Sequence, residues 1–279
     1  MEESRKKESG KNIHGEMSFL EHLEELRWHI IRSLIAIVVL AIVVFAMGNF
    51  IFDAIIFKPS TPDFWTNRMV AKFAELLNSD IRINEEQINF ISIKMADQFM
   101  MQIWVSLIAG FILASPIVFY EFWRFIKPAL YEKEKRHAAG AVFFTSILFG
   151  LGVLFGYFFI VPMSIQFLYG WKISDLVSPH IDIRNYVSLV SHISLAAGVT
   201  FLLPIFSYFL SKVGILSPEF MRTYRRHAYV GLLIVASIIT PPDVFSQIMV
   251  FIPLFFLYEA GILISKIVVK KREKEFNEM

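Results

Sequence analysis

The stretch QFMMQIWVSLIAGFILASPIVFY, residues 98–120, contains no charged side chain between Asp97 and Glu121. About 20 apolar residues is the length that an α-helix needs to cross roughly 30 Å of hydrocarbon. The composition agrees, because 56% hydrophobic residues and a mean hydropathy of +0.55 would overfill a soluble core. The sequence therefore predicts an all-α integral membrane protein with six transmembrane helices. The predicted spans are residues 33–52, 98–120, 138–161, 185–210, 228–240 and 244–265.

Proline residues predict where these spans are irregular. Pro162 is expected to mark the far end of the third span, and Pro204 to kink the fourth. Residues 228–240 reach only roughly 20 Å at 1.5 Å per residue before the Pro-Pro-Asp turn at 241–243. The last two spans are therefore expected to be short and to form a hairpin whose tip either stays below the far headgroups or thins the bilayer there. The alternative is one bent re-entrant element, since short apolar runs are ambiguous.

Basic residues predict the orientation. Of the 27 Lys and Arg residues, 20 lie in residues 1–32, 121–137, 211–227 and 266–279. If the chain crosses the membrane six times, these four intervals lie on one side and the other intervals between spans lie on the opposite side. The positive-inside rule then places both termini in the cytoplasm. The expected organisation is a disordered cytoplasmic arm (1–17), a six-helix membrane domain (18–268) and a cytoplasmic tail (269–279).

Several classes of function lack support in the sequence. The net charge of +2 reflects basic residues at membrane edges, where anionic headgroups favour them, so a nucleic-acid partner is not expected. The chain has no Cys, no His-Glu-x-x-His, no Gly-x-Ser-x-Gly and no Gly-rich phosphate loop with a Lys. No enzymatic activity, cofactor or metal is expected.

Acidic residues at the predicted cytoplasmic edges of the spans are the remaining candidates for a functional site. Glu25 precedes the first span and Glu134 precedes the third, at positions where basic residues would be favoured. In one interpretation Glu134 complements a helix dipole and Glu25 pairs with His29 one turn later. In the other, both carboxylates receive guanidinium groups, because Arg matches a carboxylate bidentately and Lys does not.

Glu259 is a charged residue within the last predicted span, in the segment FFLYEAG (255–261). A charge in hydrocarbon is costly, so Glu259 is expected to face the bundle or a water-filled concavity, as a polar contact for cargo or a partner helix. The alternative is that Glu259 lies near enough to the cytoplasmic edge to reach water beside Lys266.

Three motifs in a fixed order point to a family. They are FLEHLEELR (19–27) before the first span, FYEFWRFIKPALY (119–131) after the second, and TPPDVFSQ (240–247) between the fifth and sixth. Together with six spans and an inside N-terminus, these motifs closely resemble those of TatC, a subunit of the twin-arginine protein translocase. The resemblance extends from about Ser18 to Ser265.

The resemblance implies a receptor that binds signal peptides with two consecutive arginines and exports folded proteins, driven by the protonmotive force. The implied partners are TatA-like and TatB-like single-span subunits and further copies of the chain, in the cytoplasmic (inner) membrane of a bacterium. The implied signal-peptide residues are Glu25, Arg27, Phe125, Pro128 and Glu134, and the implied outer-side residues are Pro59, Asp243 and Gln247.

Two departures from the family pattern and one competing class remain. Leu202 stands where the family has an acidic residue in the fourth span, and the first outer interval, 59–97, is longer than the family needs. A proton-coupled small-solute transporter would also suit six spans, a broken helix and Glu259. Such a transporter would be expected to show repeat symmetry between its halves, and no motif recurs in this sequence.

Overall fold

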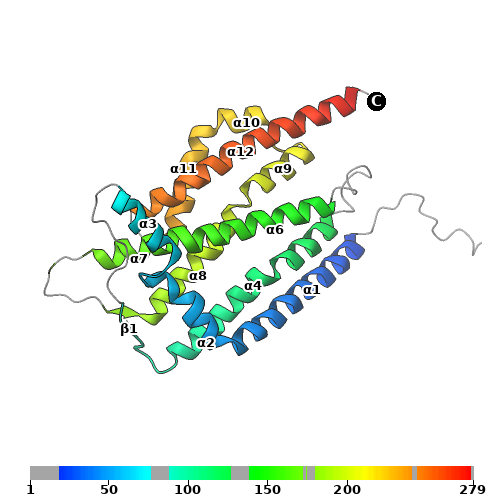
Figure 1. Ribbon diagram of the computed structural model, residues 1–279. Coiled ribbons are helices and arrows are strands. Elements are labelled where there is room, and N and C mark those ends of the chain that lie inside the picture. Colours follow the sequence, from blue (N-terminus) through cyan, green and yellow to red (C-terminus); the bar gives the residue numbers. More distant parts are fainter. Residues whose placement is uncertain are drawn as a thin grey trace, which may run out of the picture.

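The computed structural model describes residues 19–76, 88–126, 138–171, 174, 180–240 and 244–277, and this part of the chain is mostly helical (Figure 1). The expected arm at 1–17 and the Pro-Pro-Asp turn at 241–243 lie outside the described residues. The helices are α1 (Phe19–Ala46), α2 (Gly48–Ile51), α3 (Trp65–Leu76), α4 (Asp97–Ile126), α6 (Ala138–Phe155), α7 (Val161–Gly170), α8 (Ile183–Thr200), α9 (Leu203–Val213), α10 (Pro218–Thr223), α11 (Arg225–Ile239) and α12 (Val244–Asn277).

Shorter elements connect the helices. Two π-helical turns, η1 (Phe52–Ile56) and η4 (Gly156–Ile160), and one 3₁₀ turn, η2 (Lys58–Ser60), interrupt the helical runs. Strands β1 (Phe90–Ile91) and β2 (Ile181–Asp182) pair in parallel, with Phe90 opposite Ile181.

Five helical stretches of the described chain are long and apolar enough to cross a membrane: Leu23–Ala46, Asp97–Ile126, Gly140–Gly170, Ile183–Val213 and Ser246–Arg272. The fifth predicted span corresponds to α11, which has 15 residues and is too short to count among them. The short helix expected at 228–240 is therefore present, but its crossing of the membrane stays a prediction.

Several predicted boundaries are wrong. The first long helix ends at Ala46 and not at residue 52, and in its last turn the Phe45 carbonyl accepts a hydrogen bond from Gln102 Nε2 of α4 (3.0 Å). Pro162 does not end the third span. The π-helical turn η4 precedes it, and Pro162 then occupies the second position of α7, where a missing N–H costs little.

The two later proline-containing helices differ from each other. The expected kink before Pro204 is present, since the chain leaves the helix at Phe201–Leu202 and restarts as α9 with Pro204 in its first turn. The last helix is not short. α12 has 34 residues, includes Pro253 and continues through most of the expected tail to Asn277, because the segment after Ser265 contains no Gly or Pro.

Small residues allow the helices to approach closely, as is usual in lipid where burial of apolar surface does not drive association. A Cβ on Gly110 of α4 would lie 2.8 Å from the Cβ of Ala41 of α1. Gly152 and Gly156 form a Gly-x-x-x-Gly pair, and Cβ atoms there would lie 2.6 Å from the carbonyl oxygen and 2.8 Å from the Cβ of Ala197 of α8, respectively. α1 therefore packs on α4, and α6 on α8.

Hydroxyl pairs attach α12 to the bundle. Ser246 lies 2.9 Å from Ser164 of α7, and Ser265 lies 2.7 Å from Ser211 of α9, measured between the two Oγ atoms in each case. All four serines are fully buried. Each pair thus gives its two buried hydroxyl groups a hydrogen-bond partner.

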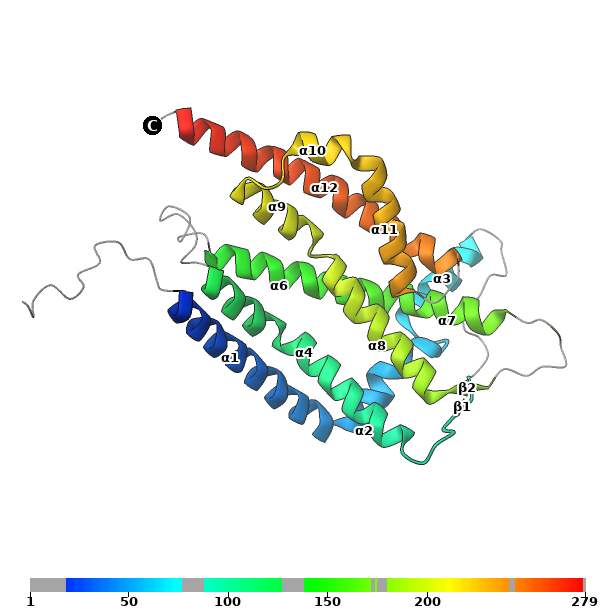
Figure 2. The same cartoon turned by 180° about the vertical axis from the view of Figure 1, so that it is seen from behind.

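The helix ends separate into two groups (Figures 1 and 2). The start of α1, the end of α4, the start of α6 and the ends of α9 and α12 lie at one end of the molecule, named here the terminal end. The strands, α2, α3 and α7 lie at the opposite end. Among the described residues, the start of α1 and the ends of α4 and α12, which belong to the basic intervals, therefore lie at the same end.

The long interval after the first span forms a cap at the opposite end. The hydroxyl groups of Tyr157 and Tyr186 donate to the carbonyls of Ile55 (2.7 Å) and Ile56 (2.9 Å), which anchors η1 to the bundle. The Trp65 ring of α3 packs edge-on against Phe158. Residues 77–87 of this interval lie outside the described residues.

Replacing Gly152 by Leu is expected to destabilise the protein by about 1–3 kcal/mol, because the added side chain overlaps the Ala197 carbonyl and the Phe201 side chain. Gly150→Leu is the matched control, since a Cβ there meets no atom within 4 Å. Thermal unfolding of the purified protein in detergent measures both. Equal transitions for the two variants would contradict close packing of α6 on α8.

Candidate functional site

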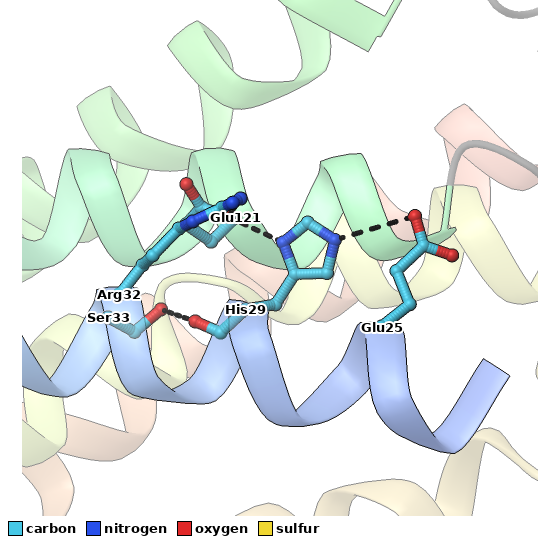
Figure 3. Close-up of polar contacts among 5 residues, drawn as sticks. All are labelled: Glu25, His29, Arg32, Ser33 and Glu121. Atoms are coloured by element: carbon cyan, nitrogen blue, oxygen red, sulfur yellow. Dashed lines mark hydrogen bonds and ion pairs between the residues drawn. The ribbon is translucent and has the colours of Figure 1, made fainter. Parts of the chain in front are cut away.

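An acidic cluster lies between α1 and α4 near the terminal end (Figure 3). Glu25 and His29 are four residues apart on α1, so their side chains lie on one face of the helix. His29 Nδ1 lies 2.5 Å from Glu121 Oε2 of α4, and His29 Nε2 lies 3.9 Å from Glu25 Oε1. His29 thus stands between two carboxylates from two helices.

Burial makes the His29–Glu121 contact necessary. His29 is 5% exposed and Glu121 is 7% exposed, and buried polar groups without partners are costly. Arg32, one turn after His29 and about half exposed, places Nη1 3.8 Å from Glu121 Oε2. Glu121 therefore receives two groups from α1, which fixes the ends of these two helices against each other.

Glu25 differs from Glu121 because it reaches the surface. Its side chain is 35% exposed, while its Oε2 atom is itself buried and has no hydrogen-bond partner among the described residues. The Phe125 ring of α4 lies edge-on to His29, with 6.0 Å between ring centroids. Glu25 of α1 and Phe125 of α4 therefore both lie beside the His29 ring.

Arg27, another predicted signal-peptide residue, is not part of this cluster. Arg27 is exposed, binds Glu24 one turn earlier (3.2 Å) and lies over the Trp28 ring (5.7 Å to the centroid). It lies two residues from Glu25, on another face of α1. Pro128 and Glu134 lie outside the described residues.

Glu259 is held by a cation from the neighbouring helix. Arg225 Nη2 donates to Glu259 Oε2 (2.7 Å), and the Tyr229 hydroxyl donates to Glu259 Oε1 (2.6 Å). Both ionic side chains are partly buried. Glu259 thus faces the neighbouring helix α11, since Arg225 begins α11 and its side chain turns toward α12. Leu202, the departure in the fourth span, is buried.

Two of the three predicted outer-side residues have structural contacts. Pro59 is buried in the η2 turn, and its carbonyl accepts a hydrogen bond from Asn67 Nδ2 of α3 (3.4 Å). Gln247 Nε2 donates to the Leu233 carbonyl (3.2 Å), which joins α12 to α11. Asp243 lies outside the described residues.

Sequence reasoning missed Glu121 of the acidic cluster and Arg225 of the α11–α12 contact. Pairing of Glu25 with His29 was one of its two interpretations, whereas Glu121 appeared only as a letter of a motif, since pairing between helices cannot be inferred from spacing along one helix. Arg225 was counted only as a basic residue. In the described part of the chain no group of three or more His, Asp or Glu side chains is arranged to hold a metal ion.

Several long apolar helices of the described chain define a polytopic membrane protein, which carries an acidic cluster at one end. Residues 21–253 match the family model described as Sec-independent protein translocase protein (TatC). The chain belongs to the TatC family. Members of this family are components of a protein translocase and form no catalytic enzyme family, and the named relatives are bacterial membrane proteins.

Relatives and solved structures agree with the family model. The chain is 43% identical to the Sec-independent protein translocase protein TatC of Blattabacterium sp. subsp. Periplaneta americana, over 94% of this chain and 100% of the relative. It is 32% identical to the Sec-independent protein translocase protein TatC of Aquifex aeolicus, over 92% of this chain and 98% of the relative. A crystal structure of a twin arginine translocase receptor, TatC, matches with a TM-score of 0.68 and 32% identity, covering 89% of this chain and 99% of that one.

The Arg225–Glu259 contact predicts a non-additive effect on stability. Glu259→Leu leaves a partly buried guanidinium without its carboxylate, so it is expected to cost about 1–3 kcal/mol. The double variant Glu259→Leu/Arg225→Leu should recover most of this loss, and Glu259→Gln, which keeps the contact with Tyr229, should lie between. Thermal unfolding of the purified variants gives the coupling. Strictly additive effects would show that the ion pair does not stabilise the α11–α12 contact.

Proposed function

We propose that this chain is the receptor subunit of a twin-arginine translocation system, which binds signal peptides with two consecutive arginines at the Glu25 cluster. The observation that carries the proposal is the exposure and hydrogen bonding of the Glu25 carboxylate. Its side chain is partly exposed at the terminal end, and its Oε2 atom is buried and has no hydrogen-bond partner among the described residues. Family membership supports the same role, as does the likeness to a solved twin arginine translocase receptor.

The chemistry of Glu25 suits an arginine ligand. A guanidinium presents N–H donors in a planar fork that can bind both oxygens of one carboxylate, and such charged hydrogen bonds are about twice as strong as neutral ones. Glu121 is already occupied by His29 and Arg32, so it is not the second acceptor. Glu134 takes that role, with Phe125 and Pro128 lining the site and Arg27 beside it.

The proposal includes a topology of six spans with both termini in the cytoplasm. α11 is the fifth span, and its 15 residues reach roughly 22 Å, so the bilayer is locally thinner beside it. Residues 18–268 form the membrane domain, in the bacterial cytoplasmic membrane. The terminal end then faces the cytoplasm, where the cargo is folded.

Export of folded cargo uses the protonmotive force and requires partners. Membership of the TatC family implies a complex with other components of the translocase. We assign to this complex TatA-like and TatB-like single-span subunits and further copies of this chain, with Pro59, Asp243 and Gln247 as functional residues on the outer side and Glu259 within the membrane.

Removing a signal-peptide carboxylate is expected to weaken binding of a twin-arginine peptide. Glu25→Ala and Glu134→Ala should each cost on the order of 1.5–3 kcal/mol per charged hydrogen bond lost, partly screened by salt at the membrane surface. Binding of a fluorescent signal peptide to the protein in nanodiscs measures this loss, with a Lys-Lys peptide as control. Both variants should insert normally and export less cargo. Unchanged affinity in both variants would refute the proposed site.

A further inference from the structure

His29 connects the two carboxylates of the acidic cluster. Its two ring nitrogens face different acids, with Nδ1 at 2.5 Å from Glu121 on α4 and Nε2 at 3.9 Å from Glu25 on its own helix (Figure 3). When each nitrogen of an imidazole faces a carboxylate, a contact that fixes the ring from one carboxylate also influences the orientation of the other.

The orientation of the His29 ring is fixed from three sides. The ring is buried, Glu121 holds Nδ1 from the neighbouring helix, and Phe125 packs edge-on against it. The backbone beneath the ring belongs to a continuous helical turn, in which the Ser33 hydroxyl donates to the His29 carbonyl (2.9 Å). The direction in which Nε2 points is therefore set by the α1–α4 contact and not by Glu25.

A fixed Nε2 restricts Glu25. A partly exposed glutamate has several rotatable bonds and would otherwise sample many rotamers, each of which aims its oxygens differently. With Oε1 turned to His29, the second oxygen, Oε2, is left with acceptor capacity in the described structure. Pre-organisation of this kind reduces the entropic cost of binding a ligand.

We infer that His29, held by Glu121, is a positioning residue that orients the Glu25 carboxylate for a guanidinium. The inference rests on the proposed role of Glu25. A bidentate Arg–carboxylate contact depends on the orientation of both oxygens, whereas a Lys ammonium is a compact charge that tolerates rotation. His29 therefore contributes to the discrimination between a twin-arginine and a Lys-Lys signal, beyond any effect on the fold.

The decisive variant replaces both buried groups, His29→Leu/Glu121→Leu. Removing His29 alone would leave Glu121 buried without its closest partner, whereas replacing both partners by apolar side chains is tolerated far better. The full chain in nanodiscs is tested with fluorescent twin-arginine and Lys-Lys signal peptides. We expect thermal stability near that of the unsubstituted protein, a twin-arginine affinity lower by on the order of tenfold, and an almost unchanged Lys-Lys affinity.

A double-mutant cycle with Glu25→Ala separates positioning from a structural effect. If His29 acts through Glu25, adding Glu25→Ala to the double variant causes little further loss of twin-arginine affinity. Ser33→Ala is the control, because it removes a hydrogen bond to the His29 backbone but leaves the ring contacts in place. Equal losses for both peptides, or losses that add to that of Glu25→Ala, would overturn the inference.

The same measurements distinguish failure of the inference from failure of the proposed function. If Glu25→Ala itself leaves twin-arginine affinity unchanged, the proposed function of Glu25 fails. If Glu25→Ala weakens binding but the double variant binds normally, only the role of His29 is overturned. Should the double variant unfold, His29→Gln replaces it, since one amide cannot contact both carboxylates as the imidazole does. Selective loss of twin-arginine affinity in His29→Gln supports positioning, and unchanged selectivity overturns it.

Discussion

Hydrocarbon offers no hydrogen-bond partner to the backbone, so each peptide group within the membrane must be satisfied inside the protein. This constraint accounts for the long helices and for the way in which they are interrupted. The helical run through Pro162 is maintained by a π-helical turn, and the chain before Pro204 leaves the helix for two residues and then restarts it. Burial of apolar surface does not hold helices together in lipid. Close packing does so instead, and it is possible here because Gly110, Gly152 and Gly156 have no side chain to separate the helices.

The same constraint explains why the polar side chains of the bundle occur in pairs. His29 with Glu121, Arg225 with Glu259, and Ser246 with Ser164 each join two helices, and in each pair one group satisfies the other. Glu25 extends from the His29–Glu121 pair and is partly exposed, and its buried Oε2 atom has no hydrogen-bond partner in the described structure. A group with this spare capacity is suited to a ligand that brings its own donors.

The sequence predicted the helical class, the approximate position of each apolar run and the break before Pro204, because charge and proline act locally along the chain. It did not predict the continuation through Pro162, where a π-helical turn is followed by α7 with Pro162 at its second position. The spacing of Glu25 and His29 was visible, but their link to Glu121, 92 residues further along, required the tertiary structure. Arg225 was likewise recognisable as a partner of Glu259 only after α11 and α12 were placed side by side.

Site-specific photo-crosslinking from position 125, where Phe125 packs against His29 beside Glu25, tests the proposed signal-peptide site without relying on affinities. A photoreactive residue at this position, in the full chain in native membranes, is exposed to a precursor with a twin-arginine signal and to the same precursor with Lys-Lys. A signal-peptide site at Glu25 predicts a crosslink to the twin-arginine signal that is lost with Lys-Lys and strongly reduced in the Glu25→Ala background. Crosslinks of equal yield for both precursors, or none for either, would contradict it.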